Sequence, residues 1–208
     1  MSARRAGHPG LNLGETDAST HAQAGHDVFG FWIFLMSDAV IFALLFATYG
    51  VMLAGTSWGP EPADVYKIVP AFIETVILLT SSLTFGMASI TLKHSRGVRP
   101  LMALLAVTLA LGLVFLAMEL HDFATMIANG AVPSRSGFLS SFFALVSLHG
   151  VHVLAGCLWI VVMMVQIPAF GRDPRIKINM LRLGLFWHFL DIVWIAIFSL
   201  VYLQGLAR

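Results

Sequence analysis

The sequence is poor in charged residues. Only 11% of its 208 residues are charged, whereas soluble domains usually carry about 25%. Its formal net charge is only +1, and nucleic-acid-binding domains need a dense basic face. The composition therefore argues against an aqueous globular domain and against a nucleic-acid partner.

Cysteine motifs and nucleotide-binding motifs are also missing. The single cysteine, Cys157, excludes an internal disulfide and any Cys-x-x-Cys zinc or redox motif. There is no Gly-x-Gly-x-x-Gly fingerprint and no phosphate-binding P-loop. Residues 1–27 contain no apolar core of a secretory signal, and we predict that they form a disordered cytoplasmic tail.

Long apolar segments dominate the rest of the chain, and 58% of all residues are hydrophobic. A membrane-spanning helix needs about 20 mostly apolar residues, and five stretches meet this requirement. Glycine and proline mark the connections between them. We predict an all-α polytopic membrane bundle over residues 28–206, with transmembrane helices at about 28–53, 68–92, 101–120, 137–170 and 183–206.

The distribution of Lys and Arg predicts the orientation of this bundle, because cytoplasmic loops carry an excess of both. Nine of the 12 fall on one side of a five-span topology. The N-terminus is therefore predicted to be cytoplasmic and the C-terminus periplasmic. The nine are Arg4, Arg5, Lys93, Arg96, Arg99, Arg172, Arg175, Lys177 and Arg182, against Lys67, Arg135 and Arg208 on the other side.

Seven ionisable residues fall inside the predicted spans. Because each costs a few kcal/mol to insert, they are expected to face the bundle interior, a water-filled pocket or a partner subunit. His149 and His152 are three residues apart and therefore share one helix face, as do His188 and Asp191. Trp187 and Trp194 lie on the same helix stripe as Asp191. The seven are Asp38, Glu74, Glu119, His149, His152, His188 and Asp191.

Three hypotheses fit this set when it is considered by residue type alone. Histidines on two helices with an aspartate are possible metal or haem ligands, although the Glu-x-x-His pairs of helical di-iron sites are missing. Asp38 is a candidate member of a proton path. Alternatively, these groups hydrogen-bond between helices and hold the bundle together.

Four segments place polar residues in a fixed pattern within apolar stretches, and they are FGFWIFLMSDAVIF (29–42), ETVILLTSSLTFGM (74–87), SGFLSSFFALVSLHGVHVLAG (136–156) and LFWHFLDIVWIAIFSLVYL (185–203). These segments resemble subunit III of haem–copper terminal oxidases. The His-Gly-x-His-Val and Trp-His-Phe-x-Asp-x-Val-Trp patterns are the most specific. The resemblance covers residues 28–206, and the five-helix length is most similar to the bo-type ubiquinol oxidase branch.

This resemblance implies a non-catalytic subunit of a proton-pumping quinol oxidase in the bacterial plasma membrane. Such a subunit binds no haem or copper, since both haems and the copper are expected in subunit I. It packs mainly on subunit I, with subunits II and IV also in the complex, carries bound phospholipid and supports proton uptake. The resemblance implies lipid-binding or subunit I contacts at Asp38, Glu74, Glu119, His149, His152, Trp187, His188, Asp191 and Trp194.

Other functions remain open on the sequence. One is subunit III of a cytochrome c oxidase, or an accessory subunit of a nitric-oxide reductase, since both resemble this family. Another is a stand-alone proton-coupled transporter, which would be active as an isolated chain. The expected site has neither catalytic residues nor metal ligands in this chain.

Overall fold

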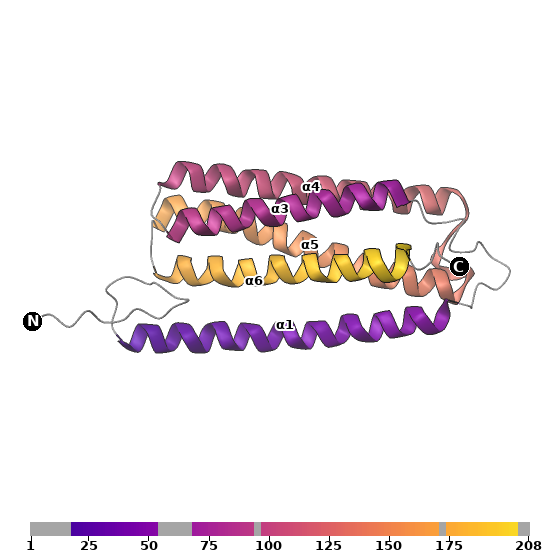
Figure 1. Ribbon diagram of the computed structural model, residues 1–208, viewed down its shortest axis with the longest axis horizontal. Coiled ribbons are helices and arrows are strands. Elements are labelled where there is room, and N and C mark those ends of the chain that lie inside the picture. Colours follow the sequence, from indigo (N-terminus) through magenta and orange to yellow (C-terminus); the bar gives the residue numbers. More distant parts are fainter. Residues whose placement is uncertain (1–17, 54–67, 94–96, 171–173, 204–208) are drawn as a thin grey trace, which may run out of the picture.

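The structure is a computed structural model that describes residues 18–53, 68–93, 97–170 and 174–203. All regular structure in these ranges is helical, which confirms the predicted all-α class. Successive long helices run antiparallel (Figure 1). They are α1 (Ala18–Met52), α3 (Ile68–Lys93), α4 (Val98–Ala128), α5 (Gly137–Phe170) and α6 (Pro174–Ile197), with a 3-10 turn η1 (Pro133–Arg135) and a π-helical end η2 (Phe198–Leu203).

The number of spans is also confirmed. Within the described residues, five helical segments are long and apolar enough to cross a membrane. Their backbone hydrogen bonds are made within each helix, as a hydrocarbon environment requires. The segments are Val28–Met52, Ile68–Lys93, Val98–Ala128, Gly137–Ala169 and Arg175–Leu203.

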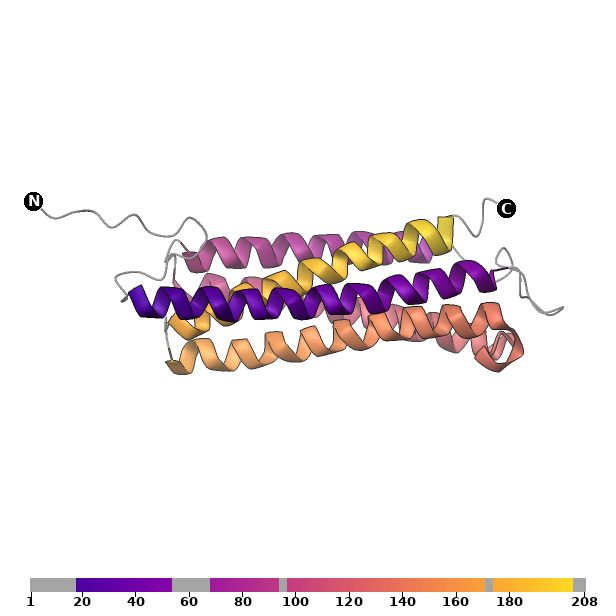
Figure 2. The ribbon, with the colours of Figure 1, turned by 90° about the horizontal axis from the view of Figure 1, so that it is seen from below.

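Helices α5 and α6 form the middle of the bundle. Helix α5 packs on α1, α4 and α6, while α6 packs on α1, α3 and α5. Helix α1 therefore covers one side of this pair, and α3 with α4 covers the other (Figures 1 and 2). Since lipid is as apolar as the core, the helices associate by close packing and hydrogen bonds rather than by the hydrophobic effect. Large aromatic side chains, including Phe85, Phe115, Trp187 and Trp194, fill the contacts.

Helices α4 and α6 are longer than predicted, in addition to α1, which is described below. Helix α4 runs to Ala128 rather than to 120, because its polar residues lower the hydropathy without breaking the helix. The chain turns only after Asn129, at Gly130, whose φ of +79° favours glycine. Helix α6 starts at Pro174 rather than at 183, since proline suits the first turn of a helix. The end of the fifth predicted helix, 204–206, lies outside the described residues.

The predicted disordered tail needs a correction at 18–27. Helix α1 begins at Ala18 instead of 28, so the polar segment before the membrane span is helical. It carries alanine at several positions, and alanine has the highest helix propensity. A helix that has already formed in the membrane adds such residues without a new nucleation step. Residues 1–17 of the predicted tail lie outside the described residues.

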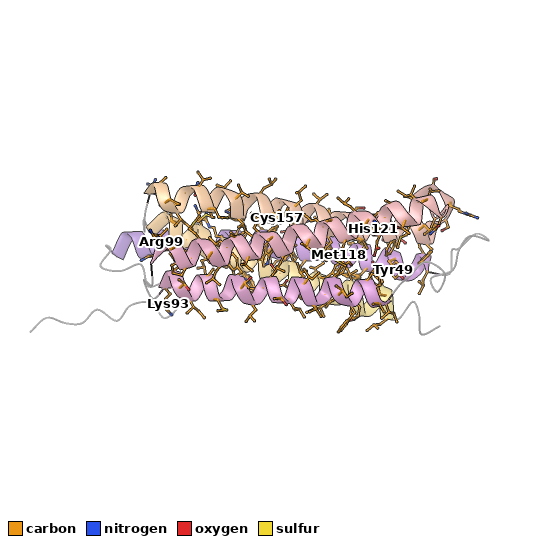
Figure 3. The ribbon with its side chains drawn as sticks, turned by 90° about the horizontal axis from the view of Figure 1, so that it is seen from above. Tyr49, Lys93, Arg99, Met118, His121 and Cys157 are labelled. Carbon is orange, nitrogen blue, oxygen red and sulfur yellow. The ribbon has the colours of Figure 1, made fainter. Side chains whose placement is uncertain are left out.

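Most of the described Lys and Arg residues lie at one end of the bundle, and Arg135 lies at the other. Lys93 and Arg99 lie at the end where α1 begins, whereas Tyr49 and His121 lie toward the opposite end (Figure 3). This arrangement agrees with the loop assignment behind the predicted orientation. The side of the membrane that each end faces stays a prediction.

Candidate functional site: three polar groups inside the bundle

Eight of the nine predicted site residues separate into three groups along the bundle, and the ninth, Trp187, is bonded to Ser81. Seven of the nine are buried, while His152 is partly exposed and His188 is exposed. The first group is the α1–α5 pair, Asp38 and His152. The second is the α3–α6 cluster of Ser82, His188 and Asp191. The third surrounds the carboxyl pair of Glu74 and Glu119 and includes His149 and Trp194.

The α1–α5 pair joins a carboxyl group to an imidazole. Asp38 Oδ2 lies 3.1 Å from His152 Nε2, although the contact is poorly aligned for a hydrogen bond. His152 Nδ1 lies 2.7 Å from the carbonyl oxygen of Leu148. Because a carbonyl oxygen only accepts, Nδ1 must carry a proton and donate it. This bond leaves Nε2 facing Asp38, so that the two side chains connect α1 to α5.

The α3–α6 cluster lies near the middle of its two spans. His188 Nδ1 lies 2.7 Å from Ser82 Oγ and 3.6 Å from Asp191 Oδ2. Asp191 is buried, but the His188 side chain is 52% exposed on the surface of the bundle. The predicted sharing of one helix face by His188 and Asp191 is therefore confirmed. The exposed imidazole creates a polar spot at mid-membrane depth.

The two tryptophans of α6 fix this helix against α3. Trp187 Nε1–H donates to Ser81 Oγ at 3.2 Å, and the Ser81 hydroxyl donates to the Thr108 carbonyl of α4 at 3.2 Å. Trp194 Nε1–H donates to Thr75 Oγ1 at 3.0 Å. These bonds satisfy both buried indole groups and link three helices in a medium that offers no water.

His149 is enclosed by aromatic rings. Its ring stacks on Trp194 with a centroid distance of 5.3 Å, and Phe115 meets it edge-on at 5.8 Å. Phe42 of α1 contacts both His149 and His152, so the two histidines share one face of α5 as predicted. His149 is fully buried, and neither ring nitrogen has a hydrogen-bond partner.

Glu74 and Glu119 bring two carboxyl groups into the same region. Glu74 comes from α3 and Glu119 from α4, and the two interact electrostatically. Their side chains are buried, and one oxygen of each has no hydrogen-bond partner. Glu119 lies against α5 at Gly150, where a Cβ atom would stand 2.7 Å from its Oε1.

The sequence did not identify the hydroxyl groups that accept the indole bonds, Ser81 and Thr75. Most Ser and Thr side chains of these helices bond to a carbonyl one turn back, as Thr75 also does with Ala71. Spacing along one helix cannot show which of them also faces a neighbour. The aromatic residues around His149 carried no sequence signal beyond their apolar character.

The residues do not fit a haem or metal site. In the part of the chain that the structure describes, no three His, Cys, Asp or Glu side chains gather as metal ligands would. The His149 ring packs against Phe and Trp rings, and His152 uses Nδ1 to bond its own helix. The arrangement is instead one of polar groups that join helices and open locally to the membrane.

Comparisons with known proteins agree with the motifs. The family described as "Cytochrome c oxidase subunit III" matches residues 14–206. The "Cytochrome bo(3) ubiquinol oxidase subunit 3" of Pseudomonas aeruginosa is 47% identical over 93% of this chain and 92% of its own length.

More distant relatives extend the same family. The "Quinol oxidase subunit 3" of Bacillus subtilis is 37% identical over 86% of this chain and 88% of its own. The "Cytochrome c oxidase subunit 3" of Alkalihalophilus pseudofirmus is 38% identical over 85% of each chain. Because the family match covers all five spans and the motifs around the three polar groups, the chain belongs to the cytochrome c oxidase subunit III family.

Proposed function

We propose that this chain is subunit III of a haem–copper quinol oxidase in the bacterial inner membrane. The complex oxidises ubiquinol, reduces dioxygen to water and moves protons outward. The names of the relatives and the five membrane-spanning helices support this assignment. Within the complex the chain is a non-catalytic subunit that packs mainly on subunit I, contacts subunits II and IV, and holds phospholipid.

The exposed imidazole of His188 is the observation that carries the assembly role. A polar side chain at mid-membrane depth loses hydrogen bonds when it faces lipid tails. His188 is nevertheless exposed there, beside Ser82 and the buried Asp191. A second protein surface would supply the missing partner. The surface around the α3–α6 cluster is therefore the proposed contact with subunit I.

The other predicted residues support this contact from within. The α1–α5 pair holds α1, which has the smallest buried share of the five spans, against the central helices. The indole bonds of Trp187 and Trp194 fix α6, which carries His188. Glu74, Glu119 and His149 occupy the bundle interior beside them. The haems and copper belong to subunit I in this proposal, since the described residues of this chain offer no fitting ligand set.

Copurification tests the assignment. An affinity tag on this chain is expected to isolate a complex that contains haem and oxidises ubiquinol, whereas the chain separated by detergent should show no haem spectrum. Purification of this chain without any haem-containing partner would contradict the proposal. Because one relative is named as a cytochrome c oxidase subunit, reduced cytochrome c should also be tested as an electron donor. Oxidation of reduced cytochrome c, but not of ubiquinol, would assign the complex to that branch.

A paired substitution tests the surface. His188→Ala is expected to weaken retention of this chain in the purified complex. Ile192→Ala is the matched control, because Ile192 lies one turn further along α6 and is also exposed but apolar. Subunit content and bound lipid are measured by native mass spectrometry. Equal retention in the two variants would remove His188 from the contact.

A further inference from the structure

Two buried carboxyl groups near one end of the bundle are not explained by helix packing. The Glu74 residue is 1% exposed and the Glu119 residue is 5% exposed. They come from neighbouring antiparallel helices and interact electrostatically. One oxygen of each is buried without a hydrogen-bond partner, although buried polar atoms nearly always have one.

The surroundings of this pair are closed on the α5 side. A Cβ atom at Gly150 would stand 2.7 Å from Glu119 Oε1 and 2.9 Å from Oε2, so the carboxyl group fits there only because residue 150 is glycine. The carboxyl group therefore rests against the backbone of α5. The next residue back is His149, which is completely buried and has two ring nitrogens without partners.

Helix α6 completes the enclosure on the α3 side. The His149 ring stacks on Trp194, and the Trp194 indole bonds to Thr75, the residue that follows Glu74. Phe115 lies one turn before Glu119 on α4 and touches both rings. The two carboxyl groups and the unpartnered imidazole thus share one aromatic enclosure built from four helices.

The charged and titratable groups around the pair are acidic or neutral. Glu74 interacts electrostatically with Asp122 of α4, and Tyr202 of η2 interacts with all three carboxyl groups and with Tyr49 of α1. Arg135 is exposed and bonds to the Gly130 carbonyl. The other described Lys and Arg side chains belong to the segments at the opposite end of the bundle, as Lys93 and Arg99 do in Figure 3.

We propose that Glu74 and Glu119 form a proton-binding site in which one of the two buried carboxyl groups holds a proton. An ionised carboxylate without a partner is very costly in an apolar medium, and two of them close together also repel each other. A bound proton removes one charge and supplies a donor for an oxygen that otherwise has none. In the loading step, a hydronium ion gives its proton to a carboxylate oxygen and leaves as water.

Asp122 provides the connection from this site to water. It lies three residues after Glu119, so both side chains project from one face of α4, and it is only partly buried. Helix α4 ends six residues later, at Ala128. Protons are therefore exchanged with the aqueous phase at the end where α4 terminates. This inference rests on the chain's own residues and is independent of the identity of the partner subunits.

Infrared spectroscopy of the intact purified complex tests the proposal. Glu74→Gln and Glu119→Gln are each expected to remove a carbonyl band of a protonated carboxyl group. Asp122→Asn is expected to keep that band. In heavy water the band shifts as the carboxyl proton exchanges for deuterium, and this exchange should be severalfold slower in the variant. The matched control is Asp38→Asn, which removes a buried carboxyl group paired with an imidazole and should leave this band in place.

The outcomes separate the alternatives. A band that is unchanged in both glutamine variants, or the loss of an ionised carboxylate band instead, would overturn the proposal. If the carboxyl proton exchanges with heavy water as fast in Asp122→Asn as in the unmodified protein, Asp122 is not the connection to water. If the glutamine variants do not assemble, Glu74→Asp and Glu119→Asp keep a carboxyl group. They should then shift the band, and an unshifted band would refute the site.

Discussion

Two glycines determine where the Trp187 side chain can lie. A Cβ atom at Gly112 of α4 would stand 3.0 Å from Trp187 Cη2, and one at Gly156 of α5 would stand 2.8 Å from Cζ3. The indole is almost completely buried and bonded to Ser81, so it cannot move aside without breaking that bond. The absence of two side chains thus allows α4, α5 and α6 to approach around one ring.

Gly156→Ala should therefore destabilise the protein by about 1–3 kcal/mol, the usual effect of overpacking a core. Gly30→Ala is the matched control, because nothing lies within 4 Å of a Cβ atom there. In that helix interior alanine is expected to be neutral or to stabilise by up to about 1 kcal/mol. The two variants are compared by their thermal unfolding midpoints in detergent. Equal midpoints would show that Trp187 can shift to accommodate the added methyl group at little cost.

At the scale of helices, single hydroxyl groups connect α3 to α6. Thr75→Val keeps the size of the side chain but leaves the Trp194 N–H without an acceptor. A buried donor left unsatisfied costs about 1–3 kcal/mol, and the variant should lose stability in that range. Unfolding by denaturant in detergent micelles measures the change.

Thr80→Val provides the control for this change. Thr80 lies on the same helix and bonds only to the Val76 carbonyl on its exposed side. Both variants lose one bond within α3, but Thr75→Val alone loses the link to α6. If the two variants unfold alike, the indole bond contributes little to holding the helices together.

The helices show which features the sequence can predict. Five apolar segments separated by Gly and Pro were enough for the number of spans. The ends of α4 and α6 were not predictable from hydropathy, because polar residues such as His121 and Asp122 continue a helix whose hydrogen bonds are already formed.

Contacts within a helix were easier to predict than contacts between helices. Spacing alone placed His188 beside Asp191. It could not pair Asp38 with His152, because helical periodicity gives each helix a polar face but not its rotation toward a neighbour. The aromatic enclosure of His149 depends on four helices together, so no local pattern could indicate it.

At the scale of the molecule, Asp191 connects the bundle interior to its surface. Asp191→Leu should weaken assembly with subunit I, because it leaves the exposed His188 and Ser82 without their buried carboxyl group. Asp191→Asn is the control, since the amide keeps the size and an oxygen acceptor. The measurement is the amount of this chain that copurifies with a tagged subunit I. An unchanged stoichiometry in the leucine variant would refute the prediction.

The orientation of the whole bundle is open to a direct chemical test. The native Cys157 is buried in α5, so it should give little background with a membrane-impermeant maleimide. Because nine of the 12 Lys and Arg residues lie on the predicted cytoplasmic side, Ala207→Cys should be labelled in intact spheroplasts. Ala3→Cys should be labelled only after permeabilisation. The reverse pattern would mean that the basic loops face outward, and it would also place the end of α4 beside Asp122 in the cytoplasm.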